Sequence, residues 1–155
     1  MKSKGIRHLL VMAVCIIITA SSLVGCDFTC DCNIYFDNKT SDTIVLAYLD
    51  SADFSFRFKG PLTIEPGGTI LVIDDYTFDR NPTKDDVIWD MNKYFPEGLI
   101  MTSHDSRSRC FSPDSANSQS NSPFVESSFR YESEKGTFGY NLYAYYEITE
   151  SIMNN

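Results

Sequence analysis

The stretch FGYNLYAYYEI, residues 138–148, decides the fold class of this chain. Successive side chains of a strand point to opposite faces, so the apolar and aromatic residues at every second position share one face. Residues 128–133 form a second β-prone run, and Glu134, Lys135 and Gly136 lie between the two runs. The pattern predicts a β-hairpin with one buried face. The residues on that face are Phe138, Tyr140, Leu142, Ala144, Tyr146 and Ile148.

Similar short runs precede this hairpin. Residues 33–36 and 43–49 are rich in Ile, Tyr, Phe and Val and flank a polar turn, which indicates another hairpin. Residues 54–59 alternate aromatic and polar side chains, as in a half-buried strand. Further strands are expected at 62–65, 69–73 and 98–103. Pro66 and Gly67 between two of them predict a type II turn, because proline presets φ at the first corner and glycine accepts positive φ at the second.

One segment has a helical period instead. Thr83 can cap a helix with Asp86 at its third position, and the apolar residues of 87–95 recur about every 3.6 positions. Trp89 and Asp90 lie off that stripe. We therefore predict one helix of about three turns, which ends near Pro96.

Together these patterns predict an all-β protein, an antiparallel β-sandwich of about seven strands with one short helical insertion. The expected domain covers residues 33–150. Residues 106–128 are mostly Ser, Asn, Asp, Gln and Pro, and we expect them to form a long Ser-rich loop.

The first 25 residues have the three parts of a secretory signal peptide. A basic start with Lys2, Lys4 and Arg7 precedes an apolar core at 9–18 that is too short for a comfortable membrane span, and a run of mainly small residues follows. Leu-Val-Gly-Cys at 23–26 resembles the bacterial lipobox. That resemblance implies cleavage after residue 25, lipidation of Cys26 and a lipidated tether at 26–32, whereas the alternative is an ordinary signal with a chance cysteine.

Cleavage would leave 130 of the 155 residues, enough for one domain with a real core. The signal carries three basic and no acidic residues, so ten Lys and Arg would remain against 21 Asp and Glu, a formal net charge of −11. This balance argues against nucleic acid as a partner and against direct docking on anionic lipid headgroups. It would suit a cationic partner, although a solvated acidic surface is the simpler interpretation.

The lipobox, Asn-Lys-Thr-Ser-Asp-Thr-Ile at 38–44 and Ile-Glu-Pro-Gly-Gly at 64–68 together make the chain similar to small β-rich lipoproteins of Bacteroidetes. This resemblance implies an outer-membrane lipoprotein that can reach the cell surface. It also implies O-glycosylation at Asp-Ser/Thr motifs, for which Thr43, Ser51 and Ser115 are candidates; ordinary polar turn residues are the alternative.

Removal of the signal would also discard Cys15, and lipidation would occupy Cys26. The remaining thiols are Cys30, Cys32 and Cys110, and an odd number cannot all pair. We expect a disulfide from Cys110 to Cys30 or Cys32. A zinc site that adds His104 is the less favoured alternative, because its spacing is irregular, and we predict neither a metal nor another cofactor.

Few residues suggest catalysis. His104 stands beside Asp105 between two serines, but immediate sequence neighbours seldom converge as a nucleophile, a base and an acid. Acidic clusters at 74–75, 79 and 85–86 could bind Ca²⁺ or act as an acid–base pair, although helix capping explains the last one. Tyr143 and Tyr145, opposite the apolar face of 138–148, could contact a glycan or a protein, or could simply pair across strands.

We therefore expect a membrane-anchored lipoprotein of the cell envelope with a non-enzymatic structural or binding role. The two alternatives are an acidic inhibitor or immunity protein that neutralises a cationic enzyme, and a carbohydrate-active hydrolase. The sequence does not determine a ligand or an oligomeric state.

Overall fold

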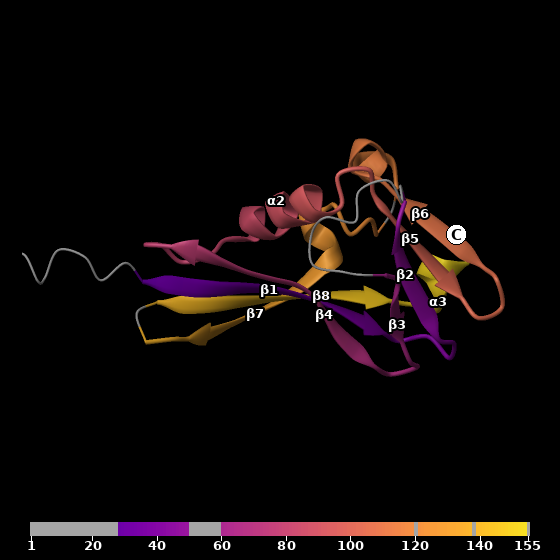
Figure 1. Ribbon diagram of the computed structural model, residues 1–155, viewed down its shortest axis with the longest axis horizontal. Helices are drawn as coiled ribbons and strands as arrows, with labels where there is room; N and C mark the ends of the chain where they lie inside the picture. The colour runs from indigo at the N-terminus through magenta and orange to yellow at the C-terminus, as the bar shows by residue number, and fades with distance from the viewer. Residues whose placement is uncertain (1–27, 50–59, 120, 138, 155) are drawn as a thin grey trace, which may run out of the picture.

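The computed structural model describes residues 28–49, 60–119, 121–137 and 139–154. The lipidation candidate Cys26, the glycosylation candidate Ser51 and the strand expected at 54–59 lie outside these ranges. The described chain forms two four-stranded sheets (Figure 1). Sheet A has the order β4 (Thr69–Phe78), β1 (Thr29–Asn38), β8 (Tyr140–Ile148), β7 (Phe129–Lys135), and sheet B has the order β3 (Leu62–Ile64), β2 (Ile44–Tyr48), β5 (Leu99–Ser103), β6 (Ser108–Phe111).

The predicted all-β sandwich with a short helix is confirmed. Neighbouring strands are antiparallel with one exception, because β1 and β8 pair in parallel, with Tyr35 opposite Tyr145. This pairing joins the first and last described strands at the centre of sheet A. A sequence pattern reports which face of a strand is buried but not the direction of its neighbour, which is why the prediction missed the parallel pair.

β1 begins at Thr29, four residues earlier than the strand predicted from residue 33. Cys30 and Cys32 are buried together with Ile34 and Phe36, and they alternate with more exposed residues along the strand. Residues 29–32 therefore belong to the sandwich rather than to the predicted tether at 26–32, and the domain begins before residue 33. Sequence reasoning predicted no strand here because it did not treat the cysteines of TCDC as apolar. Cysteine behaves as a small apolar residue when it is buried.

The hairpin predicted for 33–49 is not formed. β1 lies in sheet A and β2 in sheet B, so the polar segment between them is a corner at which the chain changes sheets. The buried Asn38 side chain builds this corner, since its amide donates to the carbonyls of Asp42 at 2.7 Å and Ile64 at 2.9 Å and accepts from Thr40. A local turn pattern cannot distinguish a hairpin from such a corner.

The segment at 65–68 is a second corner, from β3 to β4, and its predicted turn is confirmed. Gly67 has φ 71°, and the Gly68 N–H donates to the Glu65 carbonyl at 2.8 Å. The two corners are joined, because the Gly67 N–H donates to the Asn38 carbonyl at 2.9 Å. These two crossings between the sheets therefore lie at the same end of the sandwich.

The predicted helix is confirmed as α2 (Lys84–Tyr94), with a capping box between Thr83 and Asp86. The helix packs on β1 and β4 through Val87 and Met91, over the half of sheet A where β1 begins, whereas sheet B lies toward the other half (Figure 1). The final hairpin also forms, with β7 ending at Lys135 and β8 beginning at Tyr140, slightly later than predicted. A short helix, α3 (Glu150–Met153), follows β8.

The expected Ser-rich loop at 106–128 is more ordered than predicted. It contains β6 and two 3₁₀ helices, η1 (Pro113–Ser118) and η2 (Glu126–Ser128). Phe111, Ala116 and Phe124 are buried and connect the segment to the core. Burial of these apolar residues, together with the pairing of β6 with β5, anchors this polar segment to the core.

Candidate functional site

A hollow of about 560 Å³ lies between the free edge of β4 and one side of α2, and we call it the β4–α2 hollow. It combines carboxyl groups, two cationic side chains and aromatic residues, a mixture that is typical of ligand sites. Its lining residues are Asp75, Tyr76, Thr77, Phe78, Arg80, Asp86, Trp89, Asp90 and Lys93.

Strand and helix periods bring these residues together. Asp75 stands opposite Cys32 on β1, so it points to the inner face of sheet A, toward α2. On the helix, Asp86, Asp90 and Lys93 are three or four positions apart and therefore lie on one side. The hollow therefore forms where one face of a strand adjoins one side of a helix, although the two elements are separate in the sequence.

Asp75 is an ionised, fully engaged acceptor. Its Oδ2 accepts hydrogen bonds from the Tyr94 hydroxyl at 2.6 Å and from Lys93 Nζ at 2.9 Å. Burial raises the pKa of Asp75, but the hydrogen bonds from Tyr94 and Lys93 outweigh it, and the pKa is lowered overall.

Asp86 is also engaged. Its carboxylate pairs with the Arg80 guanidinium, and it accepts the Thr83 backbone N–H at 2.7 Å as part of the capping box. The hydrogen bonds from Arg80 lower the pKa of Asp86 to about 2. The interpretation of Asp86 as a capping residue is therefore confirmed.

Asp90 differs from both. It is only 4% exposed, and its hydrogen-bonding neighbour is the Cys32 thiol, which is a weak donor. Burial, followed by the negative charge of Asp75, raises the pKa of Asp90 to about 7. Burial and the Asp90 charge likewise raise the pKa of Cys32 to about 12, so this thiol stays protonated and is not a nucleophile at neutral pH.

Three exposed aromatic residues are among those that line the hollow. Trp89 is 61% exposed, Phe78 60% and Tyr76 49%, and the rings of Tyr76 and Phe78 meet edge to face at 5.0 Å. Lys93 Nζ lies 4.7 Å from the centre of the Trp89 ring. Exposed rings beside a buried carboxyl can stack on a ligand or hold a cation.

Sequence reasoning named Asp75 and Asp86 of this site within its acidic clusters but missed Trp89 and Asp90. The helical stripe places Trp89 and Asp90 outside the core, yet Asp90 is buried, because α2 packs on β1 and β4 and Asp90 meets Cys32 of β1. The available signal was the single tryptophan of the chain, placed next to an acid and off the apolar stripe.

The candidates Tyr143 and Tyr145 lie together with Tyr35 on the outer face of sheet A, beside a shallow hollow rimmed by Glu132 and Glu134. The rings of Tyr35 and Tyr145 stack at 5.1 Å, and the Arg130 guanidinium carbon lies 4.3 Å from the centre of the Tyr145 ring. Tyr143 also contacts the Tyr35 ring, with ring centres 6.5 Å apart, and its hydroxyl donates to Glu134 at 3.4 Å. Both tyrosines therefore make cross-strand contacts on this face.

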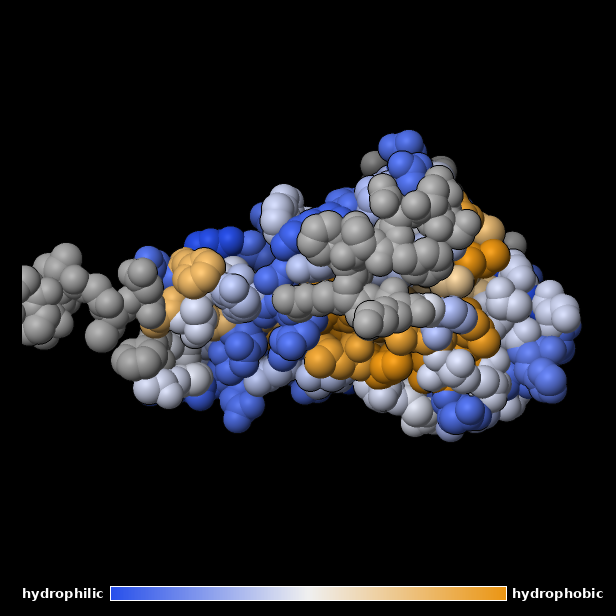
Figure 2. Space-filling model, viewed as in Figure 1, coloured by the Kyte–Doolittle hydropathy of each residue, from blue (hydrophilic) through white to orange (hydrophobic). Residues whose placement is uncertain are grey.

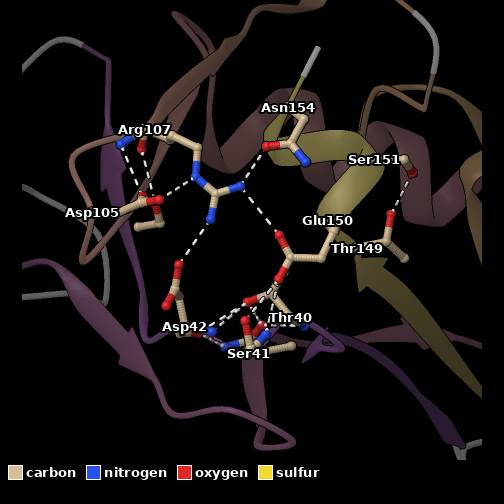
Figure 3. A network of polar contacts seen from close by, with 11 residues as sticks. Thr40, Ser41, Asp42, Asp105, Arg107, Thr149, Glu150, Ser151 and Asn154 are labelled. Atoms are coloured by element: carbon tan, nitrogen blue, oxygen red, sulfur yellow. Dashed lines mark hydrogen bonds and ion pairs between the residues drawn. The ribbon is translucent and has the colours of Figure 1, made fainter.

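His104 is exposed at the tip of the β5–β6 hairpin. Its neighbour Asp105 accepts from Ser103 and from Arg107 Nε, the latter at 2.6 Å. Figure 3 shows Arg107 at the centre of a polar network that reaches Asp42, Glu150 and Asn154 from other parts of the chain. Ser103 and Asp105 are thus engaged in a structural network rather than arranged as a catalytic set with His104.

Other acidic residues do not converge. Within the described ranges, no group of three or more His, Cys, Asp or Glu side chains could hold a metal ion. Asp79 adopts φ 55° in the turn after β4, where its carboxylate accepts the Phe28 N–H at 3.3 Å. Asp85 is exposed in the first turn of α2, where its charge favours the helix N-terminus.

The predicted disulfide from Cys110 is not seen. All three described cysteines are free, with Cys30 and Cys32 buried and Cys110 exposed. Cys30 and Cys32 lie on a central strand of sheet A, whereas Cys110 lies on the edge strand of sheet B. The prediction assumed a movable N-terminal tether, and the incorporation of residues 29–32 into β1 removes that freedom.

The two described glycosylation candidates are only partly exposed. The Thr43 hydroxyl donates to Glu65 at 2.8 Å just before β2, and the Ser115 hydroxyl contacts the Ser112 carbonyl at 3.3 Å within η1. Ala116, which completes the motif of Ser115, is buried. Modification of Ser115 would therefore require local opening of η1.

Figure 2 shows that the largest apolar area of this face lies over the half of the molecule that carries sheet B, and that the half where β1 begins is mostly hydrophilic. No described helix is long and apolar enough to cross a membrane.

No protein-family model, curated protein or solved structure matches this chain. The functional argument therefore depends on the geometry of the hollow.

Proposed function

We propose that this protein is a lipid-anchored, non-enzymatic binding module of the bacterial cell envelope, and that the β4–α2 hollow contacts its ligand. The proposed anchor is Cys26, and two residues separate it from the start of β1. Residue 29 pairs with Phe78 at the end of β4, which also lines the hollow. An anchor at Cys26 would therefore hold the hollow at the membrane-proximal end of the domain.

The observation that supports a binding role best is the combination of Trp89 and Asp90. Trp89 is the most exposed of the large hydrophobic residues named above, and Asp90 carries a nearly buried carboxyl in the same hollow. Exposed aromatic residues beside a convergent polar group are a common feature of ligand sites.

A hydrolase has less support. Acid–base catalysis of glycoside hydrolysis requires two carboxyl groups free to exchange protons. Asp75 and Asp86 are both held as ionised acceptors, which leaves Asp90 as the carboxyl of the hollow with a raised pKa.

An inhibitor or immunity protein against a cationic enzyme is the second candidate function. The net charge of −8 for the whole chain, or −11 after cleavage at residue 25, would accelerate association with a cationic partner. Retention of cationic hydrolases on the immobilised protein at low and moderate salt tests this candidate. The absence of retention at both salt concentrations would reject it.

The anchor is tested on the native protein by intact mass and by partition into a detergent phase. We expect a mass that begins at Cys26 and includes acyl chains, and we expect Cys26→Ser to abolish both acylation and partition. Native protein recovered from the culture supernatant without acyl mass would contradict the proposal.

A further inference from the structure

Asp90 has acceptor capacity that the described chain does not use. Its carboxyl lines the β4–α2 hollow, is nearly buried and has the Cys32 thiol as its hydrogen-bonding neighbour. Within the described residues, no Lys, Arg or amide side chain donates a hydrogen bond to it. A buried carboxylate without a strong donor is costly, so the site favours a group that brings one.

The charges that face Asp90 make this preference specific for a cation. Asp75 on β4 and Asp86 on α2 both disfavour its ionised form, and Lys93 on α2 favours it. Lys93 is already paired with Asp75, and Arg80 is already paired with Asp86. An incoming cation would therefore compensate a negative charge that the existing pairs leave uncovered.

The hollow already holds one ammonium group in the way that a ligand would be held. Lys93 Nζ lies 2.9 Å from Asp75 Oδ2, 4.7 Å from the centre of the Trp89 ring and 4.6 Å from the centre of the Tyr94 ring. A carboxylate together with aromatic rings is a recurrent arrangement for cation recognition. Asp90 and Trp89 line the same hollow, so a second ammonium there would meet the same two kinds of group, a carboxyl and an aromatic ring.

We propose that the β4–α2 hollow binds a primary ammonium group on an aliphatic stem, the chemistry of a lysine side chain on a cationic protein partner, with Asp90 as its counter-ion and Trp89 as its aromatic contact. This assignment rests on the proposed function, because it names the ligand class of the same hollow. The volume of about 560 Å³ is within the usual range of ligand sites and exceeds what one lysine side chain needs.

Trp89 provides a direct measurement, because it is the single tryptophan of the chain. The native protein in non-ionic detergent is titrated with the tripeptide acetyl-Gly-Lys-Gly-amide while the Trp89 fluorescence is recorded. We expect a saturable change, and binding at least about tenfold weaker for the same peptide with Nε-acetylated lysine, because acetylation removes the charge.

Two variants and one control test the residue roles. We expect Asp90→Asn to weaken binding of the lysine peptide about tenfold or more, since the amide keeps the shape and loses the charge. Trp89→Phe lacks the fluorescent side chain, so its binding is measured by calorimetry. We expect this variant to bind the lysine peptide severalfold more weakly than the wild type. Glu97→Gln changes an exposed acid outside the hollow and should leave binding unchanged.

The pH dependence separates a counter-ion from a merely structural residue. Because the pKa of Asp90 is about 7, its ionised fraction falls about tenfold between pH 8 and pH 6. The affinity for the lysine peptide should fall by about the same factor over this range, whereas the residual affinity of Asp90→Asn should stay constant.

Equal binding of the lysine and acetyl-lysine peptides would overturn the assignment. So would an Asp90→Asn variant that binds the lysine peptide as the wild type does and whose unfolding midpoint is no lower than that of the wild type. If neutral chitotriose changes the Trp89 signal and the lysine peptide does not, the hollow remains a ligand site and only its ammonium specificity is wrong. If no probe changes the signal, the proposed site fails as well, and the anchor is judged separately by the acyl mass.

Discussion

Single polar residues control both the corner of the sandwich and its candidate site. Asn38 is fully buried, and its side-chain amide contacts Thr40, Asp42 and Ile64, which lie in two chain segments. Asp90 is buried, and its hydrogen-bonding neighbour, the Cys32 thiol, compensates little of the cost of removing its carboxyl from water. The first arrangement stabilises the fold, and the second reduces stability in exchange for a polar group at the hollow.

Asn38→Ala should lower the free energy of unfolding by about 2–4 kcal/mol. The substitution removes the Asn38 donor from the Ile64 and Asp42 carbonyls and the Asn38 acceptor from the Thr40 N–H at a buried corner. Urea denaturation measures this loss. Asn92→Ala is the matched control, because Asn92 is exposed on α2 and alanine favours helix, so its change should stay within about 0.5 kcal/mol.

Asp90→Asn should stabilise the protein more at pH 8 than at pH 5. The folded pKa of Asp90 is about 7 and the ordinary value is 3.8, so the folded state binds more protons than the unfolded state between these pH values. This group therefore destabilises the wild type increasingly as the pH rises from about 4 to 7. Urea denaturation should show a gain that is about 1–3 kcal/mol larger at pH 8 than at pH 5.

Asp86→Asn is the control of opposite sign. The folded pKa of Asp86 is lowered to about 2, so its carboxylate stabilises the protein above the ordinary pKa and loses this effect as the pH falls through 2. The variant should be less stable than the wild type at neutral pH. Parallel pH profiles for the two variants would contradict the roles assigned to both carboxyls.

At the level of elements, α2 and β5 are joined by a turn with little room. Gly98 has φ 111°, and a Cβ at this position would lie 2.1 Å from the Phe111 carbonyl oxygen on β6. Backbone cannot move aside as a flexible side chain can. The conformation of this turn therefore sets how α2 is connected to sheet B.

Gly98→Ala should cost more than about 3 kcal/mol, because it adds a backbone clash to an unfavourable φ. Gly67→Ala is the control: Gly67 also has positive φ, 71°, but a Cβ there meets nothing within 4 Å, so we expect about 1 kcal/mol. Thermal unfolding of both variants measures the difference. Equal losses would mean that the backbone relaxes at residue 98.

Arg107 connects three elements through its ion pairs and hydrogen bonds. Its guanidinium contacts Asp42 at the first corner, Asp105 in the β5–β6 hairpin and Glu150 at the start of α3 (Figure 3). Arg107→Met should increase amide hydrogen exchange in α3 and leave the centre of sheet A protected. Arg130→Met, which removes pairs on the edge strand β7, should leave α3 unchanged.

At the level of the whole molecule, the cysteines report on the packing of both sheets. Cys110 is exposed on the edge of sheet B, whereas Cys30 and Cys32 are buried in sheet A. In native protein, a maleimide should label Cys110 within minutes and should reach the other two only after unfolding. Peptide mapping measures the sites. Equal labelling of all three, or a native disulfide that involves Cys110, would contradict this arrangement.

The sequence by itself determined the elements whose information is local. Alternation in 138–148 predicts β8 and the burial of Ala144, Tyr146 and Ile148, although Tyr140 on the same face is exposed and Phe138 lies outside the described residues. The capping box of Thr83 and Asp86 predicts the start of α2, and Pro66 with Gly67 predicts the turn. Each of these depends on a few neighbouring residues, because the backbone period and the allowed φ act at short range. The signal and the anchor at Cys26 remain predictions.

Only the tertiary structure decided how the elements meet. It placed β1 and β2 in different sheets, paired β1 with β8 in parallel and brought TCDC into the core. It also buried Asp90 against a strand more than ten residues away. The partner of a strand and the burial of a side chain outside the apolar stripe depend on which surfaces pack together. The packing of the whole core decides this, because a local sequence pattern carries no information about the neighbouring element.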